Sequence, residues 1–302
     1  MRAPGNTTQS GARLLVVMMG FAWGINWVAA RFILQALPPW TMRAIGIGLG
    51  LLTLAVAAVI ARVPLAIGRK DMPKVLIAGF FNVAAFGVGS AYAQIYGSTS
   101  RAIVIAYSMP IWAALAARVV LKEKLNAVKL GALALCAIGL FILIWPAARA
   151  GLPLGALFAL GCAWSWAAGT IYLKWAKIEA PVLASAVWQL LFGWLMLTAG
   201  MFAYEGLPPL SPPPFSVLAW IAYNGLIGMG LAYFLWFEVI GRLPATTASL
   251  GSLLVPVVGV IGSALIVGER PSLADIVGFA CIFASAASVL LQPSEKPTEM
   301  PE

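Results

Sequence analysis

The sequence predicts an all-α integral membrane protein whose ten transmembrane helices form two five-helix halves of inverted topology. Three observations lead to this prediction: an apolar composition, ten apolar runs of membrane-spanning length, and one motif that occurs twice. Of the 302 residues, 62% are hydrophobic and only 10% are charged. A soluble domain of this length carries more polar surface, so lipid is the expected solvent for this chain.

The apolar runs account for most of the chain. Roughly twenty consecutive apolar residues cross a bilayer as an α-helix. Ten such runs lie at about 13–36, 40–61, 74–96, 101–121, 127–145, 153–174, 181–204, 215–237, 245–267 and 273–291. The first run is longer than the core of a signal peptide, so we expect it to be a retained helix. The polar tails, 1–12 and 292–302, fall outside the spans.

One motif occurs in both halves of the chain. Each copy has a Pro, an acid–base pair at the same later interval, and a Gly that opens the next apolar run. The two sets are Pro110, Glu123-Lys124 and Gly131, then Pro256, Glu269-Arg270 and Gly278. Three features in the same order indicate internal duplication, which defines units at 13–146 and 151–291. Each unit has five spans, an odd number, so the second must enter the membrane from the opposite side, as in transporters with inverted repeats.

The loop charges predict the orientation. If the amino terminus is cytoplasmic, the loops on that side and the tails hold fourteen of the 19 Lys and Arg residues. Cytoplasmic loops carry the excess of basic residues in membrane proteins. We therefore expect both tails, 1–12 and 292–302, in the cytoplasm. The fifth and tenth spans carry almost no polar side chains, so we expect them at the periphery.

Several function classes fit the composition poorly. The net charge is +9, but the basic residues lie between the apolar runs and form no cluster with aromatics, so no nucleic-acid partner is expected. The chain has no His, and its three Cys lie inside apolar runs without metal-ligand spacing. We therefore expect no metal and no cofactor. A membrane-embedded enzyme is disfavoured because the spans offer no His and no carboxylate pair.

The motifs resemble those of the drug/metabolite transporter superfamily, in its EamA-type branch. The closest stretch comprises 245–250, Pro256, Gly268-Glu269-Arg270 and Gly278, and the first half has a degraded copy in which Lys122 replaces the Gly. The resemblance implies a 5+5 inverted repeat around a central cavity. It also implies export of amino acids, aromatic and other neutral ones, or of similar small metabolites across a bacterial inner (plasma) membrane. Multidrug or cation efflux and nucleotide-sugar or sugar-phosphate exchange are the alternatives.

Polar and aromatic residues near mid-span are the candidates for the cavity. A polar group in lipid costs free energy unless it has a partner, so it usually faces the bundle interior or a wet cavity. The candidates are Trp23, Asn26, Asn82, Tyr107, Trp164, Gln189, Tyr223, Asn224 and Ser252. Two interpretations stay open for each: contact with a zwitterionic substrate, or packing and hydrogen bonding between helices. Trp23 and Trp164 are paired because they occupy corresponding positions in the two halves.

Three further residues are candidates for mechanism. Pro110 and Pro256 lie inside their spans and interrupt the helical hydrogen-bond ladder, either as hinges or as static bends. Arg43 lies a few residues inside the second span, where it either extends to the membrane surface or attracts an acidic group at the outer mouth. Proton-coupled carriers keep Asp, Glu or His in the core. We find none there, so we expect alternating access without a midplane proton-carrying carboxylate, with the solute and membrane lipid as partners.

Overall fold

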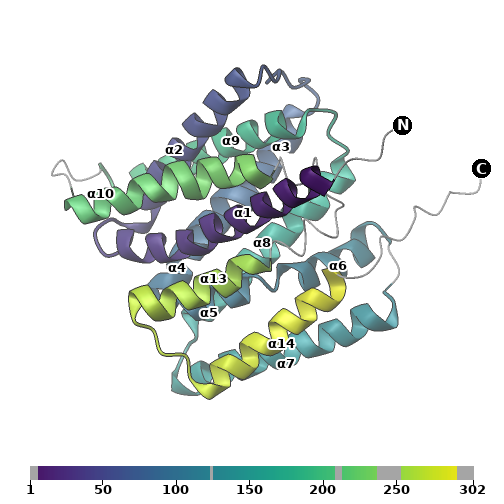
Figure 1. The fold of residues 1–302 in the computed structure, drawn as a ribbon, viewed down its shortest axis with the longest axis vertical. Coiled ribbons are helices and arrows are strands. Elements are labelled where there is room, and N and C mark those ends of the chain that lie inside the picture. Colours follow the sequence, from purple (N-terminus) through teal and green to yellow (C-terminus); the bar gives the residue numbers. More distant parts are fainter. Residues whose placement is uncertain (1–5, 123–124, 208–212, 237–252, 291–302) are drawn as a thin grey trace, which may run out of the picture.

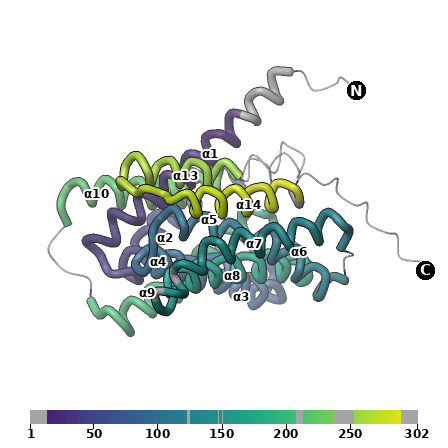
Figure 2. Tube along the Cα trace, turned by 90° about the horizontal axis from the view of Figure 1, so that it is seen from below, coloured from purple at the N-terminus to yellow at the C-terminus, as the bar shows by residue number. Residues whose placement is uncertain are grey.

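The computed structural model describes residues 6–122, 125–207, 213–236 and 253–290, and these residues form helices and short connections with no β-strand. Ser252, one of the predicted cavity residues, lies outside the described residues. The helices form one bundle, which Figure 1 and Figure 2 show in orthogonal views. In order they are α1 (Asn6–Ile33), α2 (Pro39–Ile60), α3 (Met72–Gly79), η1 (Phe80–Ala85), α4 (Phe86–Ile95), α5 (Thr99–Ala106), α6 (Met109–Val120), α7 (Ala127–Ala150), α8 (Leu154–Ala176), α9 (Val182–Tyr204), α10 (Phe215–Ala222), η2 (Tyr223–Leu231), α13 (Leu254–Gly262), η3 (Ser263–Val267) and α14 (Leu273–Leu290).

Eight helical segments in the described residues are long and apolar enough to cross a membrane, so the protein is a multi-pass membrane protein. They correspond to the first eight predicted runs. The last two runs appear as shorter apolar helices, 254–267 and 273–288. The ninth run is short because its first residues, 245–252, lie outside the described part of the chain.

Three spans contain wide, π-helical turns. They are η1 in the third span, η2 in the eighth and η3 in the ninth. A π-helical turn changes the phase of the helix, and such turns occur frequently at functional sites. Here η1 carries Asn82 and η2 carries Tyr223 and Asn224, three of the predicted polar residues.

The two predicted Pro positions lie at helix starts. The fourth span is broken at Tyr107 and Ser108 into α5 and α6, and Pro110 lies in the first turn of α6. Pro256 lies in the first turn of α13. A Pro in the first turn removes no helical hydrogen bond, because the first N–H groups of a helix have no partner within it. Each Pro therefore lies near the start of a helix and not in the middle of one, and its role as a hinge or a static bend stays a prediction.

Helices from distant parts of the sequence pack side by side. α2 packs against α9, α1 against α13 and η2, and α8 against α4 and α6. α7 packs against α14, and the pair lies together at one edge of the bundle (Figure 1, Figure 2). The central region of the bundle lies between helices that include α1, α2, α4 and α8.

Small residues permit close contact where amide side chains are buried between helices. Asn224 Nδ2 donates a hydrogen bond to Asn26 Oδ1 at 2.7 Å, which joins η2 to α1. A Cβ added at Gly228 would lie 2.1 Å from Asn26 Oδ1, and one added at Gly46 would lie 2.1 Å from Asn224 Oδ1. η2 and α2 must therefore present Gly where these amides pass, and small residues serve the same purpose in membrane helix packing generally.

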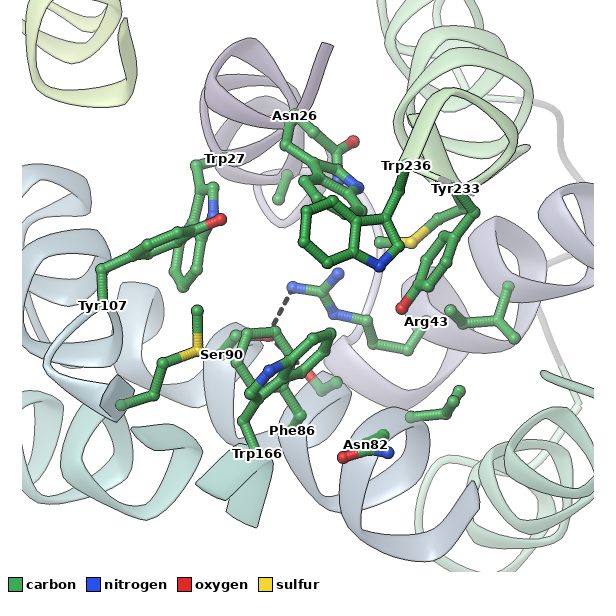
Figure 3. A pocket seen from close by; sticks show the side chains of 17 residues that line it. Asn26, Trp27, Arg43, Asn82, Phe86, Ser90, Tyr107, Trp166, Tyr233 and Trp236 are labelled. Atoms are coloured by element: carbon green, nitrogen blue, oxygen red, sulfur yellow. Dashed lines mark hydrogen bonds between the residues drawn. The ribbon is translucent and has the colours of Figure 1, made fainter. Parts of the chain in front are cut away.

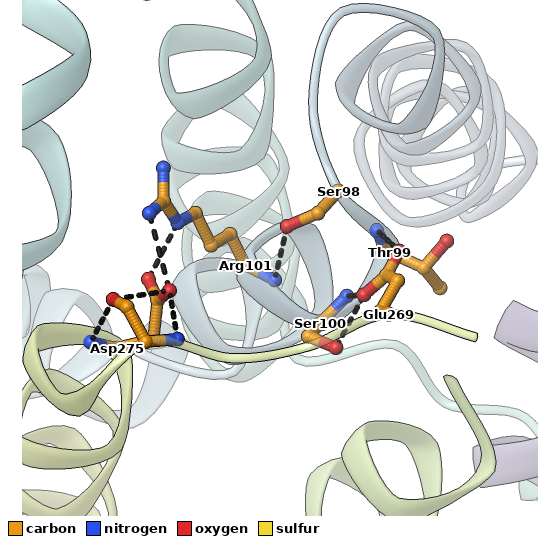
Figure 4. A network of polar contacts seen from close by, with 7 residues as sticks. Ser98, Thr99, Ser100, Arg101, Glu269 and Asp275 are labelled. Atoms are coloured by element: carbon orange, nitrogen blue, oxygen red, sulfur yellow. Dashed lines mark hydrogen bonds and ion pairs between the residues drawn. The ribbon is translucent and has the colours of Figure 1, made fainter. Parts of the chain in front are cut away.

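Two glutamates cap helices that lie far away in the sequence. Glu269 accepts hydrogen bonds from the Thr99 and Ser100 amides, at 2.6 and 2.9 Å, and from the Ser100 hydroxyl, at the start of α5 (Figure 4). Glu205 accepts in the same way from the amides of Trp40 and Thr41, at 2.8 and 2.7 Å, at the start of α2. A carboxylate at these positions satisfies unpaired N–H groups and interacts favourably with the helix dipole.

Candidate functional site

A cavity of about 170 Å³ lies in the central region of the bundle. Seven aromatic residues line it, and the side chains of Asn, Arg and Ser residues also reach it. The rings are Trp23, Trp27, Phe86, Tyr107, Trp166, Tyr233 and Trp236, and the polar residues are Asn26, Arg43, Asn82 and Ser90 (Figure 3). A comparable apolar cavity of about 150 Å³ binds benzene, so this cavity has room for one aromatic ring.

The aromatic wall is held by contacts among the rings. Trp23 meets Tyr233 edge-to-face, with ring centroids 5.6 Å apart. Phe86 makes edge contacts with Trp27 at 6.4 Å and with Trp166 at 5.2 Å. Edge-to-face pairs of this kind add to the free energy of simple area burial. The wall therefore contains two groups of contacting rings, one from α1 and the eighth span and the other from α1, α4 and α8.

Arg43 places a positive charge in this cavity. Its side chain is only 5% exposed, and Figure 3 shows the guanidinium between the labelled rings. Arg43 Nη2 donates to Ser90 Oγ at 2.9 Å, and Ser90 Oγ donates in turn to the Gly87 carbonyl at 2.9 Å. Arg43 Nε is buried without a hydrogen-bond partner. A buried, unneutralised guanidinium is costly, which makes it a candidate binding group.

A second cavity of about 400 Å³ adjoins the first. The two share a wall of six residues: Trp23, Asn82, Val83, Trp166, Tyr233 and Trp236. The second cavity continues along α8 and α9 to Ile178 and Ala180, in the turn between these helices. Together the two neighbouring cavities extend from the centre of the bundle to the end of the bundle at which α8 ends and α9 begins.

Amide side chains line the region where the two cavities meet. Asn82 Nδ2 donates to Gln189 Oε1 at 2.9 Å, and Gln189 Nε2 donates to Ser185 Oγ at 3.2 Å. Asn82 Oδ1 is buried and has no hydrogen-bond partner. Among the fully buried polar atoms of the lining, Arg43 Nε is therefore a donor and Asn82 Oδ1 an acceptor without a hydrogen-bond partner.

No metal site accompanies these cavities in the described residues, which contain no group of three His, Cys, Asp or Glu side chains. Comparison with known families then identifies the type of protein. The model of the EamA-like transporter family matches residues 11–145 and, a second time, residues 153–291. The chain belongs to the EamA-like transporter family.

Several curated transport proteins are similar to this chain over most of their length. An uncharacterized transporter, YoaV, from Bacillus subtilis is 23% identical and covers 87% of this chain and 91% of its own. A probable amino-acid metabolite efflux pump from Salmonella typhimurium is 25% identical, covering 90% and 91%. A probable terminal-alkyne amino-acid exporter from Streptantibioticus cattleyicolor is 23% identical, covering 77% and 79%. A solved structure titled "Crystal structure of protein" shares the fold at a TM-score of 0.62 and 21% identity, covering 93% of this chain and 97% of its own.

The EamA-family fold brings five of the predicted residues to the cavities. Trp23, Asn26, Asn82 and Tyr107 line the first cavity, and Gln189 lines the second. They come from four different spans, since Trp23 and Asn26 both lie on α1, so the sequence alone could not place them together. Their assembly depends on the packing of helices from both halves.

The other predicted residues lie elsewhere. Trp164 lines neither cavity; it is 50% exposed and packs edge-to-face on Trp112 at 5.4 Å. Tyr223 donates from its hydroxyl to the Ala22 carbonyl at 3.2 Å, and Asn224 bonds to Asn26, so both join helices. The correspondence between Trp23 and Trp164 in the sequence therefore does not extend to the cavity.

Arg43 also differs from its expected position. The sequence predicted that Arg43 would lie at the outer mouth or would extend to the membrane surface. In the structure its side chain is buried in the wall of the central cavity. The side chain runs past Gly87, where an added Cβ would lie 3.6 Å from Arg43 Cδ. A small residue on α4 and the Ser90 hydroxyl one turn later therefore hold the guanidinium inside.

Sequence reasoning missed most of the aromatic wall. Phe86, Tyr233 and Trp236 carried no distinguishing signal, because aromatic residues are common in apolar runs. Trp166 is informative because it lies two residues from Trp164 on α8. Consecutive helical residues turn by about 100°, so these two side chains point to nearly opposite faces. The sequence shows that one of them can face inward but not which one.

Proposed function

We propose that this protein exports amino acids, aromatic and other neutral ones, or similar small metabolites by alternating access. The observation that carries the proposal is the central aromatic cavity with its unpaired Arg43 donor and its unpaired Asn82 acceptor. Rings offer an apolar surface to a side chain, and the Arg43 guanidinium suits a carboxylate. The names of two relatives, an amino-acid metabolite efflux pump and an amino-acid exporter, agree with this class.

We also propose that the alternation arises from two inverted five-helix units, 13–146 and 151–291. The family model matches twice, once in each unit. The helix contacts also occur in matching pairs: α1 packs on α13 and η2, as α8 packs on α6 and η1. Likewise α2 packs on η2, as α9 packs on η1. Exchange of conformation between two such halves converts an inward-open carrier into an outward-open one.

The proposed setting is a bacterial inner (plasma) membrane, with both termini in the cytoplasm. The excess of Lys and Arg in the loops on that side supports this orientation. The second cavity then extends toward the cytoplasm, since it reaches the turn between α8 and α9. No Asp or Glu of the described residues lines either cavity, which supports transport without a midplane proton-carrying carboxylate. The same feature disfavours efflux of cations, which need a negative partner.

A counterflow assay in proteoliposomes tests the proposal. Vesicles preloaded with unlabelled L-phenylalanine, L-leucine, uridine or tetraethylammonium are exposed to a trace of the labelled solute. Accumulation of the amino acids, but not of uridine or tetraethylammonium, is expected. Accumulation of tetraethylammonium alone would support cation efflux instead, and accumulation of none of the solutes would refute the proposal.

Two tryptophans on the same helix supply a matched pair of variants. Trp166 lines both cavities, whereas Trp164 lines neither. Trp166→Ala removes the ring that α8 contributes to the aromatic wall and should lower counterflow by about tenfold or more. Trp164→Ala removes a ring of the same size from α8 and should retain most of the wild-type rate. Equal losses in the two variants would show that the cavity is not the transport site.

A further inference from the structure

The donors of Arg43 are mostly unused. A guanidinium has five N–H groups in a fixed, planar fork. The hydrogen bond from Nη2 to Ser90 Oγ engages one of these groups, and Nε, on the same side chain, is buried without an acceptor. Ser90 is itself a neutral hydroxyl whose proton is committed to the Gly87 carbonyl. Arg43 therefore has the hydrogen-bonding capacity for another acceptor and no charge partner in this network.

The carboxylates of the described residues cannot neutralise Arg43, because each is engaged elsewhere. Two are in ion pairs with lysines near the α2–α3 and α8–α9 connections, two cap helices, and one pairs with another arginine. These are Asp71 with Lys74, Glu179 with Lys70, Glu205 at the start of α2, Glu269 at the start of α5, and Asp275 with Arg101. Among the described residues, the charge that lines the cavity is thus the positive charge of Arg43.

We infer that Arg43 binds the carboxylate of the transported solute, and that the solute class is a monocarboxylate with an aromatic or branched apolar tail, for which an amino group is not required. The inference rests on the proposed function for its cavity and deepens it by naming the group that is recognised. A carboxylate matches the fork of a guanidinium with two parallel hydrogen bonds and supplies the missing charge. The Arg43 guanidinium, which lies among the cavity rings and bonds only to Ser90, is the group from which such a pair of bonds would begin (Figure 3).

The remaining wall selects the tail of the solute. Trp23, Trp27, Phe86 and Trp166 surround the space beside the guanidinium with ring surfaces, which favour an aromatic or branched apolar group. A phosphate ester would bring up to two negative charges to a cavity with one basic residue. A monoanion matches the single charge better.

The ammonium group of an amino acid finds little to hold it. The cavities offer the Asn82 amide oxygen and ring faces, but no carboxylate among the described residues. Arg43 also repels a positive group that arrives without its own negative charge. An amine without a carboxylate should therefore bind poorly, and a carboxylate without an amine should bind well.

A series of three ligands tests this prediction on the purified protein in detergent. L-Phenylalanine, 3-phenylpropionate and phenethylamine share one ring and differ in their charged groups. Dissociation constants are measured from ligand-induced thermal stabilisation. The two carboxylates should bind within about tenfold of each other, and phenethylamine at least about tenfold more weakly, as expected for the loss of charge-assisted hydrogen bonds. Binding of phenethylamine as tight as that of 3-phenylpropionate would overturn the inference.

A variant pair attributes the effect to Arg43. Arg43→Gln should weaken binding of both carboxylates by about ten- to a hundredfold and leave phenethylamine unchanged or improved. Arg31→Gln is the control, because Arg31 lies on α1, also has a buried Nε without a partner, and donates from Nη1 to the Gln94 carbonyl at 2.5 Å. Arg31 does not line either cavity, so its variant should retain the carboxylate preference. Loss of the preference in Arg31→Gln, or its retention in Arg43→Gln, would refute the assignment.

The binding data separate this inference from the proposed function. Carboxylate-selective binding without counterflow would contradict export and leave the Arg43 assignment standing. Counterflow that does not discriminate between 3-phenylpropionate and phenethylamine, and that survives Arg43→Gln, would support transport and contradict the assignment. The wild-type ligand series needs no variant, so the test holds even if Arg43→Gln fails to fold.

Discussion

Glu269 is expected to stabilise the fold by capping α5, and removal of its carboxylate measures that contribution. The side chain accepts three hydrogen bonds, from the Thr99 and Ser100 amides and from the Ser100 hydroxyl. Loss of a helix cap costs about 0.5–2 kcal/mol, and hydrogen bonds to a charged group lie toward the upper end. Since Glu269 is half-buried, water replaces part of the loss, and Glu269→Ala should cost about 1–2 kcal/mol of unfolding free energy.

Thermal unfolding of the purified protein provides the measurement. A change of 1 kcal/mol shifts the melting temperature of a chain of this order of size by about 2–4 °C, so Glu269→Ala should lower Tm by about 2–8 °C. Glu179→Ala is the control. Glu179 pairs with Lys70 at 2.8 Å, but the two side chains are 76% and 69% exposed. Such a pair contributes about 0–1 kcal/mol. If the two variants melt at the same temperature, the capping argument is wrong.

Two further predictions concern packing and pH. Gly228→Ala should lower the free energy of unfolding by about 1–3 kcal/mol, because the added Cβ would lie 2.1 Å from Asn26 Oδ1. Gly161→Ala is the control: a Cβ added there meets nothing within 4 Å, so the change should be neutral or should stabilise the protein by up to about 1 kcal/mol. The melting temperatures of the two variants check this contrast. The hydrogen bond from Lys74 lowers the pKa of Asp71 below its ordinary value, so the folded state binds fewer protons than the unfolded state. The stabilisation that the Asp71 carboxylate contributes is complete above the ordinary carboxylate pKa, and it is lost as the pH falls through the lowered pKa of the folded state. A Tm profile from pH 7 to pH 3 should therefore decline more steeply at its acid end for the wild type than for Asp71→Asn, and parallel profiles would contradict the assignment.

The sequence predicted the transmembrane segments well because segment length and apolar content are local properties. The second run, 40–61, corresponds to α2 (Pro39–Ile60), and the seventh, 181–204, corresponds to α9 (Val182–Tyr204). The fourth run, 101–121, is two helices, since the chain turns at Tyr107 and Ser108. That break could be anticipated from Pro110, but its position three residues earlier could not.

The cavity was less predictable because it depends on helix rotation. Trp164 and Trp166 are equivalent in composition and lie on one helix, and only the packing of α4 and α6 on α8 turns Trp166 inward. Arg43 shows the same limit. A basic residue near the end of a span usually reaches the surface, but Ser90 and Gly87 on a neighbouring span hold this one inside. Neither relation is present in the sequence around Arg43.

The long-range capping and pairing of helices have a consequence for biogenesis. Thr41 and Thr99 are translated long before the glutamates that cap their helices, which lie 164 and 170 residues further along the chain. Similarly, α7 is translated well before α14, the helix against which it packs. The first half of the chain is therefore inserted while the amide groups at the starts of α2 and α5 lack their carboxylate partners and the surface of α7 that packs on α14 is uncovered. Chains in such a state are prone to degradation or misassembly. Supplied as two separate polypeptides, the halves should accumulate only when both are made in the same cell.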